Sequence, residues 1–185
     1  MSLATSRIGA VLLAIAVAGG GGATAAAAPG APPATEPASQ ITAGDYCPDE
    51  QERAFLRRIN SYRASRGKPA LKLSATLGAA AEHHSRQMAR LNYFSHTMAG
   101  GMSWQRNARN HGYRFNTLMG ENIAAGNSTA RATFGQWRTS PDHNQNMLDA
   151  RYEAIGIGRA YDANSRYGWY WTTDFGGVAD GGPAC

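Results

Sequence analysis

Large apolar residues are almost absent from residues 29–44, which consist mainly of Pro, Ala, Thr, Ser and Gly. Such a segment cannot bury enough apolar surface to offset the entropy lost when a chain becomes ordered. We therefore expect residues 29–46 to be a flexible linker. The rest of the chain, 47–185, is long enough for one domain, and we expect it to begin near Cys47.

The residues before this linker have the pattern of a secretory signal peptide. Arg7 supplies one positive charge, residues 8–18 are an uninterrupted apolar run, and Ala23-Thr24-Ala25 has the small-x-small form that signal peptidase accepts. The apolar run is shorter than the roughly 20 residues needed to cross a bilayer, which argues against a membrane anchor. We expect residues 1–28 to be removed, leaving a mature protein without a transmembrane segment, either secreted or held in the cell envelope.

The expected domain is basic. Residues 47–185 contain 17 of the 18 Lys and Arg residues and 11 of the 13 Asp and Glu residues, so their formal net charge is +6. This balance suits an anionic wall polymer or an anionic lipid surface, but it does not identify either. The arginines are scattered along the sequence and no DNA- or RNA-binding motif accompanies them, so nucleic acid is not an expected partner.

Two cysteines, Cys47 and Cys185, stand at the two ends of the expected domain. In an oxidising compartment a disulfide is the default pairing for two such residues. Neither cysteine has a CxxC partner or a neighbouring histidine, so neither is expected to bind metal or act as a nucleophile. We predict a structural disulfide between them.

The periodicity of apolar residues predicts helices first and strands last. Period-two patterns predict strands over 154–161 and 169–175, while 121–125 is expected to be either a strand or a loop. This order indicates an α+β fold with an antiparallel sheet covered by helices. The expected helical segments are one starting at 48–50, one after Ser74, one after Ser103 and ending at Gly112, one over about 129–139, and a turn or short helix from Pro141 to Leu148.

The five histidines differ in their sequence context. His83 and His84 lie within an expected helix, and His84 falls on its apolar face, which favours a hydrogen-bonded core or boundary residue. His111 stands at a helix end, where we expect it at the surface. His96 and His143 occupy turn-bounded positions, which suit functional loops better than a packed helix face.

Glu121 lies among small and apolar neighbours in the sequence Gly-Glu-Asn-Ile-Ala. Two imidazoles and a carboxylate can bind Zn²⁺ or another divalent cation, or hold a water for acid–base chemistry. Spacing alone does not bring His96, Glu121 and His143 together. The chain has no HExxH, GxSxG or P-loop pattern, so the common hydrolase and nucleotide-binding signatures are absent.

Residues 112–158 resemble the core signature of bacterial domains of the CAP superfamily, named after cysteine-rich secretory proteins, antigen 5 and pathogenesis-related proteins. The GENIAAG stretch at 120–126, combined with the W-x-x-S-P-x-H-x-x-N-M-L run that starts at Trp137, is a specific combination. The resemblance to this SCP-like extracellular domain spans about 52–177. It implies an α-β-α sandwich, in which helices flank a central antiparallel sheet.

The resemblance also implies a surface groove that contains His96, Glu121 and His143 as ligand-binding, metal-ligating or catalytic candidates. The family's fourth groove residue is acidic and lies three positions after the tryptophan of the fourth helix, a position that Ser140 occupies here. Asp142 is the nearest carboxylate that can substitute. Ser140 and Asp142 therefore complete the expected groove.

Three functions agree with this resemblance. The first is a secreted binding module for a divalent metal, a lipid or another cell-envelope ligand, and the second is a metal-dependent extracellular hydrolase or peptidase with Glu121 as base. The third is a structural envelope protein. The absence of a nucleophile motif and the displaced fourth acid favour binding over catalysis. Asn122 and Asn146 are expected to connect loops through their amides, and Trp137 to lie in the core or the groove wall.

Overall fold

The computed structural model describes residues 41–185, so the signal peptide predicted over 1–28 and the first part, 29–40, of the linker predicted over 29–46 lie outside the described residues. None of the helices within 41–185 is both long and apolar enough to cross a bilayer. In chain order the elements are α1 (Glu50–Ser65), β1 (Lys72–Leu73), α2 (Ala75–Arg90), α3 (Trp104–Asn110), β2 (Met119–Ala125), α4 (Ala130–Thr139), α5 (Pro141–Leu148), β3 (Ala154–Tyr161) and β4 (Trp169–Gly176).

Side-chain caps determine where the helices begin. Asp49 and Glu52 form a capping box at the start of α1, in which each carboxylate accepts the other residue's backbone N–H, at 2.9 and 2.8 Å. Ser74, Ser103 and Thr129 each accept the N–H three residues later, at the starts of α2, α3 and α4. The helix starts predicted after Ser74 and Ser103 are therefore confirmed.

The four strands form one sheet in the order β1-β3-β4-β2. β3 pairs with β4, and β4 pairs with β2, both in antiparallel register. Residues 121–125, which were expected to be either strand or loop, are therefore part of a strand. β1 pairs parallel to β3, so the sheet is mixed rather than wholly antiparallel as predicted. The long connection through α2 supplies the crossover that a parallel pair requires, and two residues of β1 were too few to reveal their direction in the sequence.

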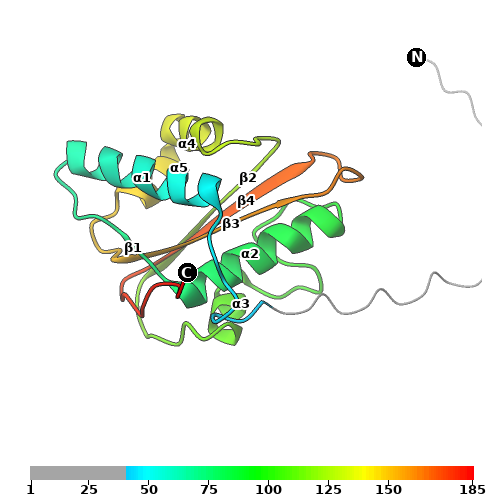
Figure 1. Ribbon diagram of the computed structural model, residues 1–185, viewed down its shortest axis with the longest axis horizontal. Helices are drawn as coiled ribbons and strands as arrows, with labels where there is room; N and C mark the ends of the chain where they lie inside the picture. Colours follow the sequence, from blue (N-terminus) through cyan, green and yellow to red (C-terminus); the bar gives the residue numbers. More distant parts are fainter. Residues whose placement is uncertain (1–40) are drawn as a thin grey trace, which may run out of the picture. The chain divides into compact units, whose positions relative to one another are not determined.

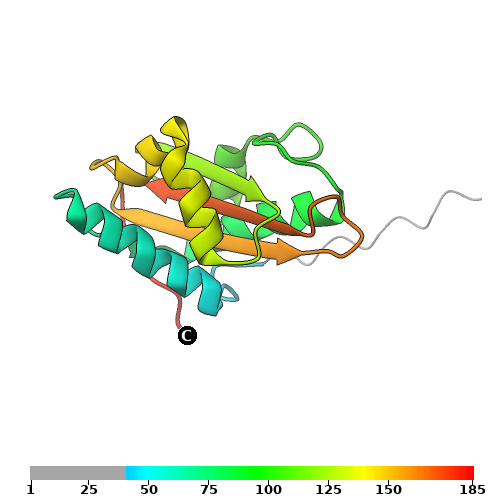
Figure 2. The same ribbon diagram turned by 90° about the horizontal axis from the view of Figure 1, so that it is seen from above.

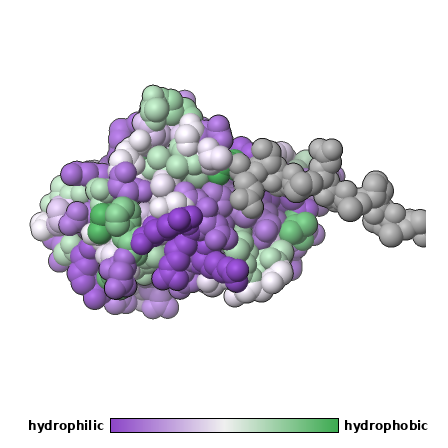
Figure 3. All heavy atoms as spheres, turned by 90° about the horizontal axis from the view of Figure 1, so that it is seen from below, coloured by the Kyte–Doolittle hydropathy of each residue, from purple (hydrophilic) through white to green (hydrophobic). Residues whose placement is uncertain are grey.

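Helices cover both faces of this sheet. α1, α4 and α5 lie on one face and α2 and α3 on the other, which gives the predicted α-β-α sandwich (Figure 1; Figure 2). The surface on the α2 and α3 side carries hydrophilic residues across its middle and hydrophobic residues in separate patches (Figure 3). The apolar side chains of these helices are thus turned toward the sheet.

Two glycines of β3 allow α2 to lie directly on the sheet. A Cβ at Gly156 would meet the backbone of Leu77, and one at Gly158 would meet the backbone between Ala81 and Glu82. The backbone of a helix cannot move aside as a flexible side chain does. The Ala-Ile-Gly-Ile-Gly sequence of β3 therefore fixes how closely α2 approaches and where its histidines lie.

The opposite face holds the larger core. Phe55 of α1 contacts the rings of Trp137 and Trp171 edge-on or tilted, at centroid distances of 5.2 and 6.1 Å. All three side chains are fully buried, which agrees with the core role expected for Trp137. This cluster anchors α1 and α4 on β4.

The packed domain begins earlier than predicted. Ile41 and Tyr46 are buried, and the Tyr46 hydroxyl donates to the Ile157 carbonyl at 2.7 Å. The Tyr46 ring lies over Gly78, where any Cβ would collide with it. Residues 41–46 therefore belong to the fold and not to the linker predicted over 29–46, because both Ile41 and Tyr46 bury apolar side chains in one cluster with Ala79 of α2.

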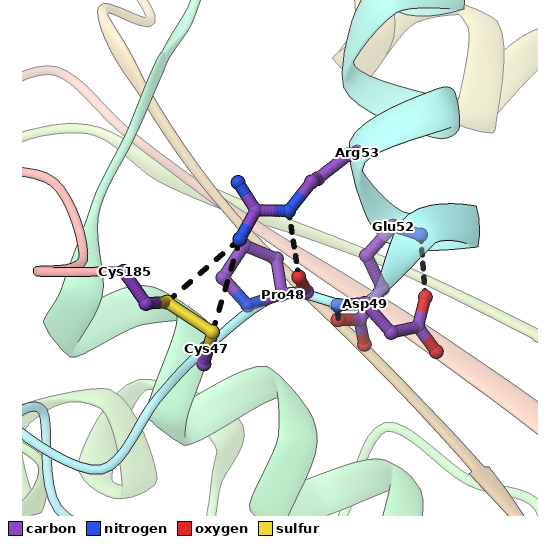
Figure 4. Close-up of a disulfide and its surroundings, with 6 residues drawn as sticks. All are labelled: Cys47, Pro48, Asp49, Glu52, Arg53 and Cys185. Carbon is purple, nitrogen blue, oxygen red and sulfur yellow. Dashed lines mark hydrogen bonds between the residues drawn. A yellow bond between two sulfur atoms is a disulfide. The ribbon is translucent and has the colours of Figure 1, made fainter.

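The predicted disulfide between Cys47 and Cys185 is confirmed, with 6.0 Å between the Cα atoms (Figure 4). Arg53 lies beside it, with one guanidinium nitrogen 3.8 Å from each sulfur and its Nε donating to the Pro48 carbonyl at 2.9 Å. The bond joins the start of α1 to the end of the chain.

Candidate functional site

Glu121 stands at the centre of a buried polar network on the edge strand β2. Its side chain is 1% exposed, and each carboxylate oxygen contacts a different imidazole. Oε2 lies 2.7 Å from Nδ1 of His84, and Oε1 lies 2.6 Å from Nδ1 of His96. The prediction that His96 and Glu121 come together is therefore met by a direct contact between residues 25 positions apart.

His84 projects from the middle of α2 and is fully buried, as expected for a hydrogen-bonded core histidine. Its Nε2 lies 3.1 Å from the Ser95 carbonyl, so both ring nitrogens face acceptor oxygens. The sequence reasoning placed His84 in the core but did not connect it with Glu121.

Asp174 is a second buried carboxyl at this site, and the sequence reasoning missed it. It lies directly opposite Glu121 in the β2–β4 register and is fully buried. Neither of its oxygens has a hydrogen-bond partner within residues 41–185. Burial, followed by the charge of Glu121, raises the pKa of Asp174 well above its usual range. A single charged residue in an otherwise uncharged strand was the signal in the sequence.

His96 connects this network to the surface. Its side chain is 53% exposed, although its Nδ1 contacts the buried Glu121. That hydrogen bond raises the pKa of His96, against the opposing effect of partial burial. Since Nδ1 donates to the carboxylate, Nε2 is the ring nitrogen that remains for a ligand.

His143 lies on α5, three residues after the serine that precedes this helix. Its Nδ1 is 2.7 Å from the Ser140 hydroxyl, and its ring stacks on Trp137 at a centroid distance of 6.0 Å. Burial and the nearby charge of His96 lower the pKa of His143, with Asp142 opposing them.

Two asparagines hold α5 against β2, as expected. The Asn122 amide donates to the His143 carbonyl at 3.1 Å. The Asn146 amide donates to the Glu121 carbonyl at 3.2 Å and to the Asn122 side-chain oxygen at 2.9 Å. His143 is therefore fixed to the strand that carries Glu121.

The fourth position of the expected groove is filled by a hydroxyl. Ser140 contacts His143 directly, whereas Asp142 is exposed and makes no hydrogen bond to His143. Asp142 therefore does not replace the missing acid, because it points from the first turn of α5 into solvent-exposed surroundings. The second carboxyl near Glu121 is Asp174.

His111 does not lie at the surface as predicted. It is 8% exposed, its Nδ1 contacts the Asn107 carbonyl at 2.8 Å, and its ring lies 5.1 Å from that of His83. Burial lowers the pKa of His111. The correction has a simple cause: α3 packs against α2, so the end of α3 is covered by the neighbouring helix.

Within residues 41–185, no three or more His, Cys, Asp or Glu side chains are placed to hold a metal ion as a group. Both oxygens of Glu121 already contact imidazoles, so in this geometry Glu121 orients His96 instead of offering a free oxygen. Among the described residues, the ring nitrogens of His96 and His143 that no protein group hydrogen-bonds are their Nε2 atoms.

The α-β-α sandwich, with imidazoles on both sides of an edge-strand glutamate, is the arrangement that the resemblance to SCP-like domains implied. The chain belongs to the CAP family, described as the cysteine-rich secretory protein family, whose profile matches residues 56–175. The resemblance found in the sequence is thereby confirmed. A comparison with curated proteins gave no match.

Solved structures agree with this assignment. An extracellular protein with an SCP domain from Bacillus anthracis str. Ames is 27% identical, with a TM-score of 0.61, over 68% of this chain and 39% of that protein. The chain thus spans well under half the length of that relative. An outer surface protein from Borrelia burgdorferi shares the fold at 20% identity and a TM-score of 0.63, over 69% of this chain and 92% of that one.

Proposed function

We propose that this CAP domain is an extracytoplasmic binding module, in which His96 and His143 present their Nε2 atoms to a divalent cation such as Zn²⁺. The bound cation would in turn coordinate a polar group of a cell-envelope ligand. One observation carries the proposal: Nδ1 of each histidine is held by a protein oxygen, from Glu121 at 2.6 Å and from Ser140 at 2.7 Å.

Metal-ligating histidines in proteins usually have their second nitrogen held in this way, which fixes the tautomer and the ring orientation. A lowered pKa keeps His143 neutral at pH 7, the state that binds a cation. The raised pKa of His96 acts in the opposite direction. Cation affinity should therefore fall as the pH drops, and protonation of His96 should be the first cause.

The same geometry supports binding over hydrolysis. Glu121 is buried and both its oxygens are engaged, so it is not free to take a proton from a water molecule. A bound cation would supply Lewis acidity and positive charge for holding a ligand oxygen. Export is supported by the disulfide and by the extracellular and outer-surface proteins that share this fold.

Titration calorimetry of the exported protein with Zn²⁺ at pH 7.5 tests this proposal. We expect His96→Ala and His143→Ala each to lower the affinity at least about tenfold, since each removes one of two nitrogen ligands. His83→Ala is the matched control, because its Nδ1 contacts Asn107 and it is not part of the proposed pair.

Equal Zn²⁺ affinity in all four proteins, or no binding by the wild type, would end the proposal. Zn²⁺-dependent hydrolysis of a protein substrate that disappears in His143→Ala would favour the hydrolase instead. If the protein binds neither a cation nor cell-envelope material, the structural envelope protein would be the favoured function.

A further inference from the structure

α1 and α4 lie on the face of the sheet opposite α2 (Figure 2). Side chains of these two helices line a groove of about 490 Å³. It is lined on α1 by residues from Ala54 to Ser65 and on α4 by Phe134 and Arg138. None of its lining residues belongs to the histidine site. The sequence reasoning did not anticipate this groove.

Three arginines give the groove its charge. Arg57 and Arg58 come from α1 and Arg138 from α4, and no acidic residue lines the groove with them. Within residues 41–185, none of the three guanidinium groups has an ion pair or a side-chain hydrogen bond, and all three residues are exposed. Arginines that were scattered in the sequence are thus gathered by the fold into an uncompensated positive site.

Two aromatic rings form its floor, and other contacts hold them in place. The rings of Tyr62 and Phe134 meet edge to face at a centroid distance of 5.6 Å. The Tyr62 hydroxyl also hydrogen-bonds the Asn144 side-chain oxygen at 3.0 Å. The guanidinium of Arg66 lies 5.4 Å from the Tyr62 centroid and extends the positive charge along α1.

The shape of the groove indicates an extended ligand. Residues 54 and 65 of α1 are separated by about 16 Å along the helix axis, at 1.5 Å per residue. A single small anion would fill only part of this length. A chain with repeated negative charges can lie along the whole of it.

Guanidinium groups bind phosphate oxygens with two parallel hydrogen bonds, and this site uses arginine without lysine. From the uncompensated arginines, the fixed aromatic floor and the length of the groove, we infer that it binds an extended, phosphate-bearing polymer of the cell envelope. This site is separate from the cation site, so the two can fail independently.

The test measures binding of linear polyphosphate and of inorganic phosphate to the exported protein at physiological salt. We expect polyphosphate to bind and the triple variant Arg57→Ser/Arg58→Ser/Arg138→Ser to bind it at least about thirtyfold more weakly, since each lost contact is a charge-assisted hydrogen bond. The control triple variant Arg106→Ser/Arg109→Ser/Arg114→Ser removes the same charge from the α3 side and should change affinity less than about threefold.

A third variant, Arg57→Lys/Arg58→Lys/Arg138→Lys, keeps the three positive charges but loses the paired hydrogen bonds of the guanidinium groups. It should recover only part of the wild-type affinity for polyphosphate. Circular dichroism spectra and thermal unfolding midpoints equal to those of the wild type would show that the groove variants are folded. Equal losses in the groove and control variants would overturn the inference, because net charge alone would then explain binding. Inorganic phosphate binding as tightly as polyphosphate would also overturn it, as would binding only to anionic lipid vesicles.

Discussion

Asp174 lies directly opposite Glu121 on neighbouring antiparallel strands, and both side chains are buried. In a site of low polarity, ionising both of two adjacent carboxyls costs much more free energy than ionising one of them. Glu121 faces two imidazole nitrogens, whereas Asp174 has no partner within residues 41–185 and its pKa is raised well above the usual range. We therefore assign the negative charge to Glu121 and the proton to Asp174.

Glu121→Gln tests this assignment. The substitution removes the carboxylate whose hydrogen bond, and to a lesser extent whose charge, raises the pKa of His96, so the pKa of His96 should fall. Nuclear magnetic resonance titration of the His96 ring measures this change. The free energy of unfolding should also fall by about 1–3 kcal/mol, because buried His84 loses a charged acceptor.

Asp174→Asn is the matched control. It replaces a neutral carboxylic acid by a neutral amide of similar shape, so the pKa of His96 should stay near its wild-type value. A fall as large as that in Glu121→Gln would show that Asp174 carries the charge, and our assignment would then be wrong.

Much of the fold followed from local signals in the sequence. Ser74 and Ser103 correctly predicted the starts of α2 and α3. The alternating pattern over 154–161 predicted β3 with the bounds that the structure has. The direction of β1 did not follow, because two residues show no pattern of their own. The ordering of Tyr46 did not follow either, because its partner, Gly78, lies on another element.

The site was predicted only in part, for a similar reason. The family resemblance singled out His96, Glu121 and His143, but the contacts that define their roles come from residues with an ordinary core pattern. In the sequence, His84 cannot be told apart from other buried helix residues. Asp174 becomes part of the site only because the register of β4 against β2 places it opposite Glu121. Such pairings depend on tertiary packing, which a single sequence does not display.

A second prediction concerns Glu52 and pH. Burial raises the pKa of Glu52 to about 8, although the N–H groups of Asp49 and Arg159 bond to its oxygens and act against this. Its reference pKa is 4.5, so the folded protein holds a proton that the unfolded chain releases over this range. The contribution is therefore present at low pH and is lost as the pH rises toward 8.

Glu52→Gln should remove this pH dependence. Urea unfolding at pH 5 and pH 8 should show the wild type losing up to about 4 kcal/mol more than the variant between the two values. The difference between the proteins isolates Glu52, because Asp174 contributes to both in the same direction. A wild type and variant with parallel pH profiles would contradict the raised pKa.

A third prediction concerns Ser140, whose hydroxyl orients His143. Ser140→Ala should weaken Zn²⁺ binding about tenfold, in line with the loss of an outer-shell partner of a ligating histidine. Ser140→Glu should strengthen it, because a carboxylate makes the imidazole a better donor. Calorimetry measures both effects, and Thr139→Ala, which alters a neighbouring hydroxyl bonded to helix carbonyls, is the control. Equal affinity in all four proteins would remove Ser140 from the site.

The last prediction concerns the disulfide, which closes a loop with a sequence separation of 138. In the chain-entropy model a loop of this length restricts the unfolded chain enough to contribute about 4–5 kcal/mol. Cys47→Ser/Cys185→Ser should therefore lower the free energy of unfolding by up to this amount, as measured by urea denaturation. Native-state hydrogen exchange should show the largest loss of protection at the start of α1, where Cys47 is attached, and little change beyond the global loss in the sheet. Two free thiols in the exported wild-type protein, or equal stability of the two proteins, would contradict the role of the bond.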